Sequence, residues 1–538
     1  MTEWWRGAVL YQIYPRSFRD GDGDGVGDLD GITDRLAYVA GLGVDGVWLS
    51  PFFRSPMKDY GYDVADHCDV DPLFGTLAGF DRLLARAHAL GLKVIIDMVL
   101  SHTSDRHPWF RASRGGRAGP KADWYVWADP RPDGTPPNNW LSVFGGPAWT
   151  WDGRRRQYYL HNFLASQPDL NLHNPEVQEA VLDACAFWLE RGVDGFRLDV
   201  ANYYLHDPAL RDNPARPPGA RWPDGVPPAS PYGMQVHRHD KSRPETLAIL
   251  RRLRRLLDGY DGRMAVAEVH DDDSVARAAE YVAGTDRLHT AYNFALLGPD
   301  GGADAIRAAV AAFEAQPGGG WPSWAFSNHD VPRVASRWGG PDAPPAAARL
   351  YLALLACLRG TAFLYQGEEL GLPEAAVPFE RLRDPFGIAL WPEAAGRDGC
   401  RTPMPWSREG AHAGFSDGEP WLPIPDEHRA RAVDVQEADP HSVLAFTRRL
   451  LAWRREEPAL RLGAISLRPD GGPLLAFERS HAERTLLCLF NPAPQPAEAT
   501  LADAGRWQAV DGPGLPGTLD GAVVRLPAWG ALFARPRE

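Results

Sequence analysis

GFRLDV, at residues 195–200, is an apolar, β-type run that ends at the charged residue Asp199. The same form recurs in DMVLSH (97–102), VAEVH (266–270) and FSNHD (326–330). A strand has this form when it is buried along its length and its carboxyl end opens into a polar site. Several strand ends feeding one site are typical of an α/β fold of the (β/α)8 barrel type. The polar residues expected at that site are Asp97, His102, Arg197, Asp199, Glu268, His329 and Asp330.

Strand-like and helix-like patterns alternate along most of the chain. The runs at 44–50 and 93–100 are apolar and β-type, and residues 32–42 and 80–90 carry apolar side chains at helical spacing. Such alternation predicts βαβ units that share one parallel sheet. Further strands are expected at 8–18, 264–268, 291–296, 324–329 and 362–366, and further helices at 177–191 and 442–456.

The alternation is interrupted in ways that predict additional domains. Residues 102–167 are rich in Trp, Gly, Pro and Asp and form an expected small inserted domain between barrel parts 1–101 and 168–458. The Pro-rich stretch 203–241 is expected to be a loop over the cleft, because loops of this length are usually functional. From 459 to 538 short β-like runs predict a C-terminal β-sandwich.

Composition limits the classes of partner. The chain has 538 residues, enough for a barrel with satellite domains, and a net charge of −13, which disfavours nucleic acid or an anionic membrane as a partner. The cysteines are scattered without a C-x-x-C pair, which disfavours a zinc site and favours free thiols in a reducing compartment. No signal peptide or membrane-length apolar run is visible, so the expected location is the cytoplasm.

Taken together with QPDLN (167–171) and GRDGCRTPMPW (396–406), these segments resemble glycoside hydrolase family 13, the α-amylase superfamily. Within it, GVGDLDGI (25–32) and GYDV (61–64) resemble the exo-acting α-glucosidase and oligo-1,6-glucosidase group. The resemblance covers nearly the whole chain. It implies a (β/α)8 TIM barrel with a small domain B after strand three and a C-terminal all-β domain.

The resemblance also implies a retaining mechanism with two flanking carboxyl groups. Asp199 would be the nucleophile, Glu268 the general acid/base, and Asp330 a third carboxylate that supports the distorted sugar. Arg197 lies two residues before Asp199, so on a strand both side chains point to one face. We expect this guanidinium to lower the pKa of Asp199, and burial to raise the pKa of Glu268.

Other residues are expected to hold the sugar. By resemblance, Asp59 and Tyr62 bind the non-reducing glucose, with Tyr62 stacked on the ring, and Arg397 or Arg401 reaches the same hydroxyls or pairs with Asp59. The remaining substrate-binding candidates are His102, Phe144, Phe163, Arg197, Val200 and His329. Phe144 and Phe163 could equally belong to the core of domain B. Asp97 is expected to be a buried organiser, and Asp169 an orderer of its loop.

The acidic loop DGDGDGVGD (20–28) predicts a cation site. Asp20, Asp22, Asp24 and Asp28 offer carboxylates at alternating positions, and Val26 offers its carbonyl oxygen. Oxygen ligands with this spacing suit a hard cation, and relatives with this motif bind one structural Ca²⁺ or Mg²⁺. The alternative is a solvated acidic turn. We expect a structural Ca²⁺, with Mg²⁺ as the alternative, that stiffens the first βα loop.

The resemblance implies an α-glucosidase acting on maltose, short oligosaccharides and aryl glucosides. The signals for linkage conflict: Val200 after the nucleophile often accompanies α-1,6 preference, whereas the 203–241 loop and the GRDGCRTPMPW form favour a maltase, so α-1,4 preference is expected. Transfer of glucose to alcohol or phenol acceptors is a further hypothesis. The alternatives are an oligo-1,6-glucosidase, a sucrose-acting transferase or isomerase, and a non-catalytic subunit. The expected assembly is a monomer or homodimer.

Overall fold

The computed structural model describes residues 3–223 and 225–537, so Asp224 of the predicted cleft loop lies outside the described residues. Within these ranges eight parallel strands form one sheet in the order β11-β10-β9-β5-β2-β1-β13-β12. A parallel bridge between Ala291 and Pro322 joins its two edges, so the sheet closes into a barrel. The strands are β1 Val9–Ile13, β2 Gly46–Leu49, β5 Lys93–Met98, β9 Gly195–Leu198, β10 Met264–Val269, β11 Thr290–Asn293, β12 Ser323–Ala325 and β13 Thr361–Tyr365.

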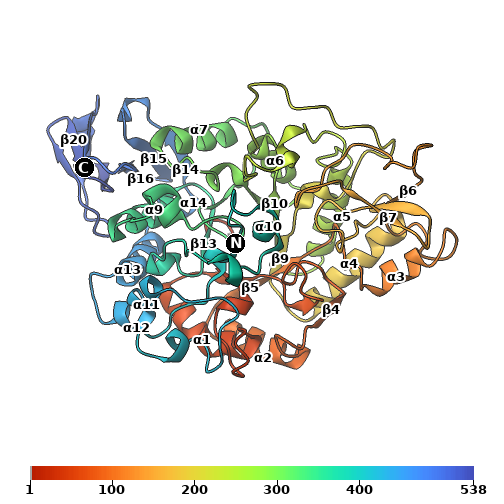
Figure 1. Cartoon of the computed structure of the whole chain (residues 1–538). Coiled ribbons are helices and arrows are strands. Elements are labelled where there is room, and N and C mark those ends of the chain that lie inside the picture. The colour runs from red at the N-terminus through yellow and green to blue at the C-terminus, as the bar shows by residue number, and fades with distance from the viewer. Residues whose placement is uncertain (1–2, 224, 538) are drawn as a thin grey trace.

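Helices pack around the barrel, as Figure 1 shows, because each carries one apolar face. Their starts are set by side-chain caps: Asp28, Thr76 and Asn174 each accept a backbone N–H at the start of α1, α2 and α4. The helices of the barrel part are α1 Leu29–Leu42, α2 Leu77–Ala89, α4 Pro175–Glu190, α5 Thr246–Leu257, α6 Ser274–Val282, α7 Ala303–Glu314, the short α8 Val334–Gly339, α9 Pro345–Cys357 and α13 Val443–Glu456. The fold class predicted from the sequence is confirmed.

Two insertions rise above the carboxyl ends of the strands. Residues 102–167 contain α3 Pro108–Arg114 and a sheet of β6 Trp127–Ala128, β7 Trp149–Asp152 and β8 Gln157–Leu160. A short antiparallel pair, β3 Phe53–Arg54 with β4 Asp66–Val70, lies between β2 and α2. The excursion after β13 holds α10 Pro385–Leu390, α11 Asp426–Ala430 and α12 Val433–Glu437.

The C-terminal part forms a separate β structure beside the barrel (Figure 1, blue). It follows α14 Pro458–Leu462 and contains two antiparallel sheets, β14-β15-β16-β21-β18 and β17-β20-β19, in the described residues. The strands are β14 Ala464–Leu467, β15 Leu475–His481, β16 Arg484–Phe490, β17 Ala497–Thr500, β18 Trp507–Ala509, β19 Thr518–Asp520, β20 Val523–Leu526 and β21 Ala531–Pro536. The buried Arg479 donates to the carbonyl of Cys357 on α9 at 2.5 Å, which ties this domain to the barrel.

Several strands end earlier than the sequence predicts. The strand expected at 93–100 ends at Met98, and the one expected at 291–296 ends at Asn293, where a 3₁₀ turn begins. The strand expected at 8–18 ends at Ile13, because Pro15 cannot donate to a ladder and begins a 3₁₀ turn. The strand at 324–329 ends at Ala325, and the chain then turns so that Asn328 accepts from the N–H of Asp330. Because these strands end early, the residues that follow them leave the sheet at the carboxyl end of the barrel. Among the described residues, no helix is long and apolar enough to cross a membrane, and all the cysteines are free thiols.

Candidate active site

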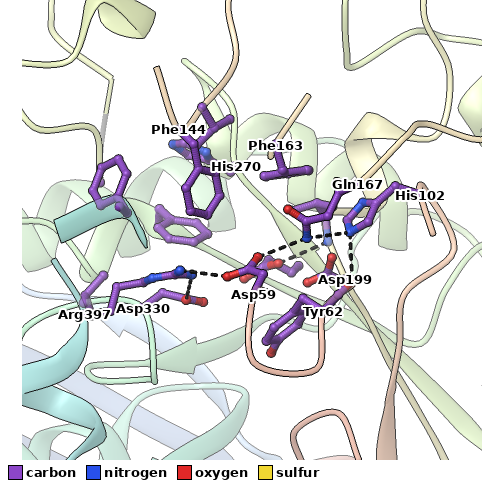
Figure 2. Close-up of a pocket in the computed structure, with 17 residues that line it drawn as sticks. Asp59, Tyr62, His102, Phe144, Phe163, Gln167, Asp199, His270, Asp330 and Arg397 are labelled. Carbon is purple, nitrogen blue, oxygen red and sulfur yellow. Dashed lines mark hydrogen bonds and ion pairs between the residues drawn. The ribbon is translucent and has the colours of Figure 1, made fainter. Parts of the chain in front are cut away.

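A cavity of about 140 Å³ lies at the carboxyl ends of the barrel strands (Figure 2). The polar part of its wall comprises Asp59, Tyr62, His102, Gln167, Asp199, Glu268, His270, Asp330 and Arg397. The apolar part comprises Val143, Phe144, Phe163, Val200, Gly225, Phe294, Val331 and Phe386.

Arg197 holds three carboxylates at the floor of this cavity. Its Nη1 lies 2.8 Å from Asp97 Oδ1 and 2.6 Å from Asp199 Oδ1, and its Nη2 lies 2.5 Å from Glu268 Oε1. Tyr292, on β11, donates its hydroxyl to Glu268 Oε1 at 2.9 Å. Arg197 is fully buried and does not line the cavity, so it orients the two carboxyl groups from behind rather than contacting a sugar.

Burial dominates the protonation of the two carboxyl groups that line the floor. It raises the pKa of Glu268 to about 7 against the opposing charge of Arg197, which confirms the expected direction. It also raises the pKa of Asp199 to about 7, although Arg197 opposes it. Arg197 lowers the pKa of Asp199 as expected, but burial outweighs this effect, so the expectation that Arg197 alone would keep Asp199 fully ionised is wrong.

The backbone at Val200 is unusual. Its φ is +35° and its ψ is +52°, a left-handed conformation that a β-branched residue rarely adopts. In this conformation the Val200 N–H donates to Glu268 Oε2 at 3.1 Å, while the side chain lines the cavity. The residue after Asp199 therefore contacts the partner carboxyl group directly through its backbone.

A second ionic cluster forms the opposite wall. Arg397 donates to Asp59 Oδ1 at 2.9 Å and to Asp330 Oδ1 at 3.3 Å, as the dashed lines in Figure 2 mark. Behind it, Asp384 accepts from Arg397 Nη2 at 2.7 Å and from Nε at 3.1 Å. This arrangement fixes two carboxylates at positions suited to accept hydrogen bonds from sugar hydroxyls.

Asp330 is held as an anion. Burial disfavours its charge, but His329, Arg397 and Arg401 outweigh burial and hold the pKa of Asp330 well below its usual range. Arg401 Nη2 lies 3.0 Å from Asp330 Oδ1, and His329 Nε2 lies 3.2 Å from Oδ2. His329 and Arg401 are fully buried and do not line the cavity, so they position Asp330 rather than touch the sugar as expected from the sequence.

His102 and Gln167 complete the polar wall beside Asp59. Gln167 Nε2 donates to Asp59 Oδ2 at 3.0 Å and lies 3.3 Å from His102 Nε2. Burial lowers the pKa of His102 to about 3, so its imidazole is neutral. Tyr62 lies beside them with its hydroxyl donated to Asp97 Oδ2 at 3.0 Å, which leaves its ring on the cavity wall.

The remaining wall is aromatic. Phe144 packs against Phe163 and Phe386 with ring centroids 6.3 and 5.7 Å apart, and both Phe144 and Phe163 line the cavity. Phe294 forms another part of the wall, where Gly225 from the long 203–241 loop approaches it. A Cβ at Gly225 would lie 3.1 Å from the Phe294 ring, and φ there is +75°, so the loop covers the cavity most closely at a glycine.

The acidic loop brings three of its four predicted carboxylate ligands together. One carboxylate oxygen each from Asp20, Asp22 and Asp28 lies within 4.8 Å of the others, a donor set that fits a hard cation. Asp24 is outside this group and accepts from the N–H of Val26 at 2.7 Å. Burial disfavours the charge of Asp20, but hydrogen bonds from Ser416 and three backbone amides lower its pKa.

The sequence analysis did not predict several residues of the site. Gln167 lies in the quoted QPDLN segment, and Tyr292 lies in an expected strand, so a closer comparison of strand ends could have found both. Asp384 sits in a Pro-rich excursion without periodicity and gave no signal. Asp169, expected to order its loop, is buried and accepts from the backbone N–H and side chain of Asn162.

Comparisons with known proteins agree along the whole chain. The family model described as "Alpha amylase, catalytic domain" matches residues 12–463. A protein of Rhizobium meliloti (strain 1021) named "Probable alpha-glucosidase" is 55% identical over 99% of this chain and 97% of its own length. An "Oligo-1,6-glucosidase" of Heyndrickxia coagulans is 36% identical over 91% of this chain and 92% of its own.

Solved structures share the fold closely. The crystal structure of an alpha-glucosyl transfer enzyme, XgtA, superposes with a TM-score of 0.98 at 57% identity and covers 100% of both chains. The trehalulose synthase MutB from Pseudomonas mesoacidophila MX-45 superposes with a TM-score of 0.88 at 30% identity, again over 100% of both chains.

Proposed function

The chain belongs to the α-amylase family, glycoside hydrolase family 13, and on this premise we propose that it is a retaining α-glucosidase that releases terminal glucose from short α-glucosides. The observation that carries the proposal is the contact of Arg197 with both Asp199 and Glu268 on the cavity floor. Two carboxyl groups that flank one site are the machinery of glycoside hydrolysis. The relatives named alpha-glucosidase support the choice of α-linked glucose as the sugar.

In the first step an Asp199 carboxylate oxygen attacks the anomeric carbon of the terminal glucose. The bond from that carbon to the glycosidic oxygen breaks, and the oxygen takes the proton of Glu268. The raised pKa of Glu268 keeps this proton available near neutral pH. Asp330 and Asp59, fixed by Arg397, hold the hydroxyls of the glucose while its ring flattens toward the oxocarbenium-like transition state.

In the second step Glu268 acts as a base. It removes a proton from water, whose oxygen attacks the anomeric carbon as the bond to Asp199 breaks, so glucose leaves with its original configuration. An alcohol or phenol hydroxyl can replace water in the same step and yields a new α-glucoside. The aromatic wall of Phe144, Phe294 and Phe386 offers such acceptors an apolar surface, and the similarity to an alpha-glucosyl transfer enzyme supports this branch.

We expect maltose, short maltooligosaccharides and aryl glucosides to be the substrates, with α-1,4 linkages preferred. The 203–241 loop supports the preference for short substrates, because Gly225 brings it onto the cavity at Phe294. An isomaltase-type preference remains the alternative, and the side chain of Val200 on the cavity wall is where the two linkages would be distinguished.

A sucrose-acting transferase or isomerase is the second candidate function. The superposition with a trehalulose synthase at a TM-score of 0.88 favours considering it. Initial rates on maltose, isomaltose and sucrose, measured side by side with product analysis, separate these functions. We expect the fastest glucose release from maltose and none in Asp199→Ala. Isomerised disaccharide from sucrose as the main product would contradict the proposal.

We further propose that the acidic loop holds a structural Ca²⁺, or alternatively Mg²⁺. Asp20, Asp22 and Asp28 would hold it, and the fit rests on their convergent carboxylate oxygens. A bound cation would neutralise these carboxylates and stiffen the loop between β1 and α1. We also propose a cytoplasmic enzyme that works as a monomer or homodimer without nucleic acid or membrane partners, which light scattering and cell fractionation can test.

A further inference from the structure

A second cavity, of about 550 Å³, lies on the side of the barrel and shares no lining residue with the active-site cavity. It is formed where β4, the start of α3 and the middle of α4 meet, elements drawn close together in Figure 1. We call it the lateral groove. Its aromatic wall consists of the half-buried Trp109 and Phe187 and the buried Trp124.

Two histidines give the lateral groove a pair of neutral hydrogen-bonding groups. His67 Nε2 lies 2.9 Å from the carbonyl oxygen of Val99 and must donate to it, so its Nδ1 carries a free lone pair. His107 Nδ1 accepts from the N–H of Trp109 at 3.1 Å, so its Nε2 carries the hydrogen. The two rings lie 5.5 Å apart, and both residues are more than nine-tenths buried.

The remaining atoms of these imidazoles have no protein partner among the described residues. His67 Nδ1 is an acceptor and His107 Nε2 is a donor, and both atoms are accessible from the open space of the groove. Both rings are uncharged near neutral pH, because burial lowers the pKa of His67 and lowers that of His107 to about 2. The lateral groove thus presents one donor and one acceptor beside aromatic rings.

The chemistry of the rim excludes several occupants. Exposed Asp66 and Asp183 line the groove and outnumber Lys121, whose Nζ lies 3.0 Å from the centroid of the Trp124 ring, so the rim disfavours an anion. The described residues bring three metal-binding side chains together only in the acidic loop at Asp20.

An uncharged sugar ring matches what remains. Its C–H face packs on indole and phenyl rings, and its hydroxyls donate to carboxylates or a lone pair and accept from an N–H. The geometry points to the lateral groove as a second saccharide-binding site, distinct from the catalytic cavity, in which Trp109 and Phe187 contact the sugar and His67 and His107 bind its hydroxyls. This site would hold a glucoside without cleaving it.

Fluorine NMR of the protein labelled with 5-fluorotryptophan tests this site without using activity. The Trp109 resonance is assigned with Trp109→Phe, and maltose is titrated into the full chain carrying Asp199→Ala, which cannot turn it over. We expect the Trp109 resonance to shift saturably with maltose. Since the readout is binding, it is independent of whether the proposed activity is correct.

Two variants and a control locate the effect. Ala180→Phe places a ring in the lateral groove from α4 and should abolish the shift, whereas Glu190→Phe, exposed on the same helix and outside the groove, should retain it. Asp66→Ala with Asp183→Ala changes only exposed side chains and should weaken binding several-fold. The proposal would be overturned if the Trp109 resonance did not move up to the solubility limit of maltose, or if the shift were unchanged in Ala180→Phe. It would also be overturned if p-nitrophenol, an aromatic compound without a sugar, shifted the resonance and maltose did not.

Discussion

The guanidinium of Arg397 donates to Asp59 with Nη2 2.9 Å from Oδ1, although 338 residues separate them in sequence. One residue lies in the loop region after β2 and the other in the excursion after β13, so this contact joins two distant loops over the barrel. The same guanidinium reaches Asp330 at 3.3 Å. Arg397 therefore sets the spacing of two carboxylates that hold the terminal glucose.

Replacing Arg397 with lysine should weaken catalysis strongly. Lysine cannot reproduce a planar donor shared by three carboxylates, and truncating one partner of a buried ion pair costs about 2–5 kcal/mol. We expect kcat/KM on maltose to fall roughly 30-fold or more, at about 1.4 kcal/mol per factor of ten. The matched control is Arg191→Lys, whose pair with Asp81 at 3.0 Å lies at the surface and should leave kcat/KM unchanged. Equal effects in the two variants would contradict the assignment.

The pH profile should be narrow and centred near neutrality. Asp199 must be ionised and its raised pKa of about 7 means that activity falls as the pH drops below that value. Glu268 must be protonated, so activity falls as the pH rises above its pKa of about 7. Because the pair shares Arg197, the active enzyme holds one proton between them. The measurement is kcat/KM against pH with a neutral aryl glucoside.

Tyr292→Phe should move the alkaline side of that profile more than the acid side. The Tyr292 hydroxyl donates to Glu268 at 2.9 Å and stabilises its ionised form. Removing this donor raises the pKa of Glu268, so the alkaline limb should shift to higher pH, with a smaller change of the acid limb because the two groups share Arg197. A shift of the alkaline limb to lower pH would contradict the role of Glu268 as the acid.

Shortening Phe294 should change where the glucosyl group goes. Phe294 lines the cavity beside His270, with ring centroids 4.8 Å apart, and its loss removes apolar contact for an acceptor and admits water. In Phe294→Ala we expect the ratio of transfer to hydrolysis, measured with maltose and a phenol, to fall about 5- to 30-fold, the equivalent of roughly 1–2 kcal/mol. Phe379→Ala, 44% exposed and outside the cavity, is the control and should not alter the ratio.

Chelation should reveal the cation proposed for the acidic loop. A ligand that binds only the folded state raises its stability, so removal with EDTA should lower the unfolding midpoint by a few degrees, and Ca²⁺ should restore it. Asp22→Asn should abolish this dependence, whereas Asp24→Asn, the same change outside the convergent group, should keep most of it. The proposal would be contradicted if EDTA left the unfolding midpoint unchanged and mass spectrometry found no metal in the purified protein.

The sequence was informative where chemistry follows a buried strand. Arg197 and Asp199 are two residues apart in the sequence, so their side chains point to one face of the strand. Arg197 Nη1 lies 2.6 Å from Asp199 Oδ1. The sequence was silent on Asp384, which reaches Arg397 from an irregular excursion, because such segments have no periodicity to extrapolate. It predicted that Arg197 lowers the pKa of Asp199 but not the net rise, since the burial that outweighs Arg197 depends on tertiary packing.

The most direct test of the account is the identity of the covalent nucleophile. The enzyme is incubated with 5-fluoro-α-D-glucosyl fluoride, which forms the glucosyl-enzyme faster than it is released, and its peptides are analysed by mass spectrometry. We predict one added fluoroglucosyl group on the peptide that contains Asp199, and no adduct in Asp199→Ala. An adduct on another carboxylate, or turnover without any adduct while Asp199→Ala remains active, would contradict the mechanism.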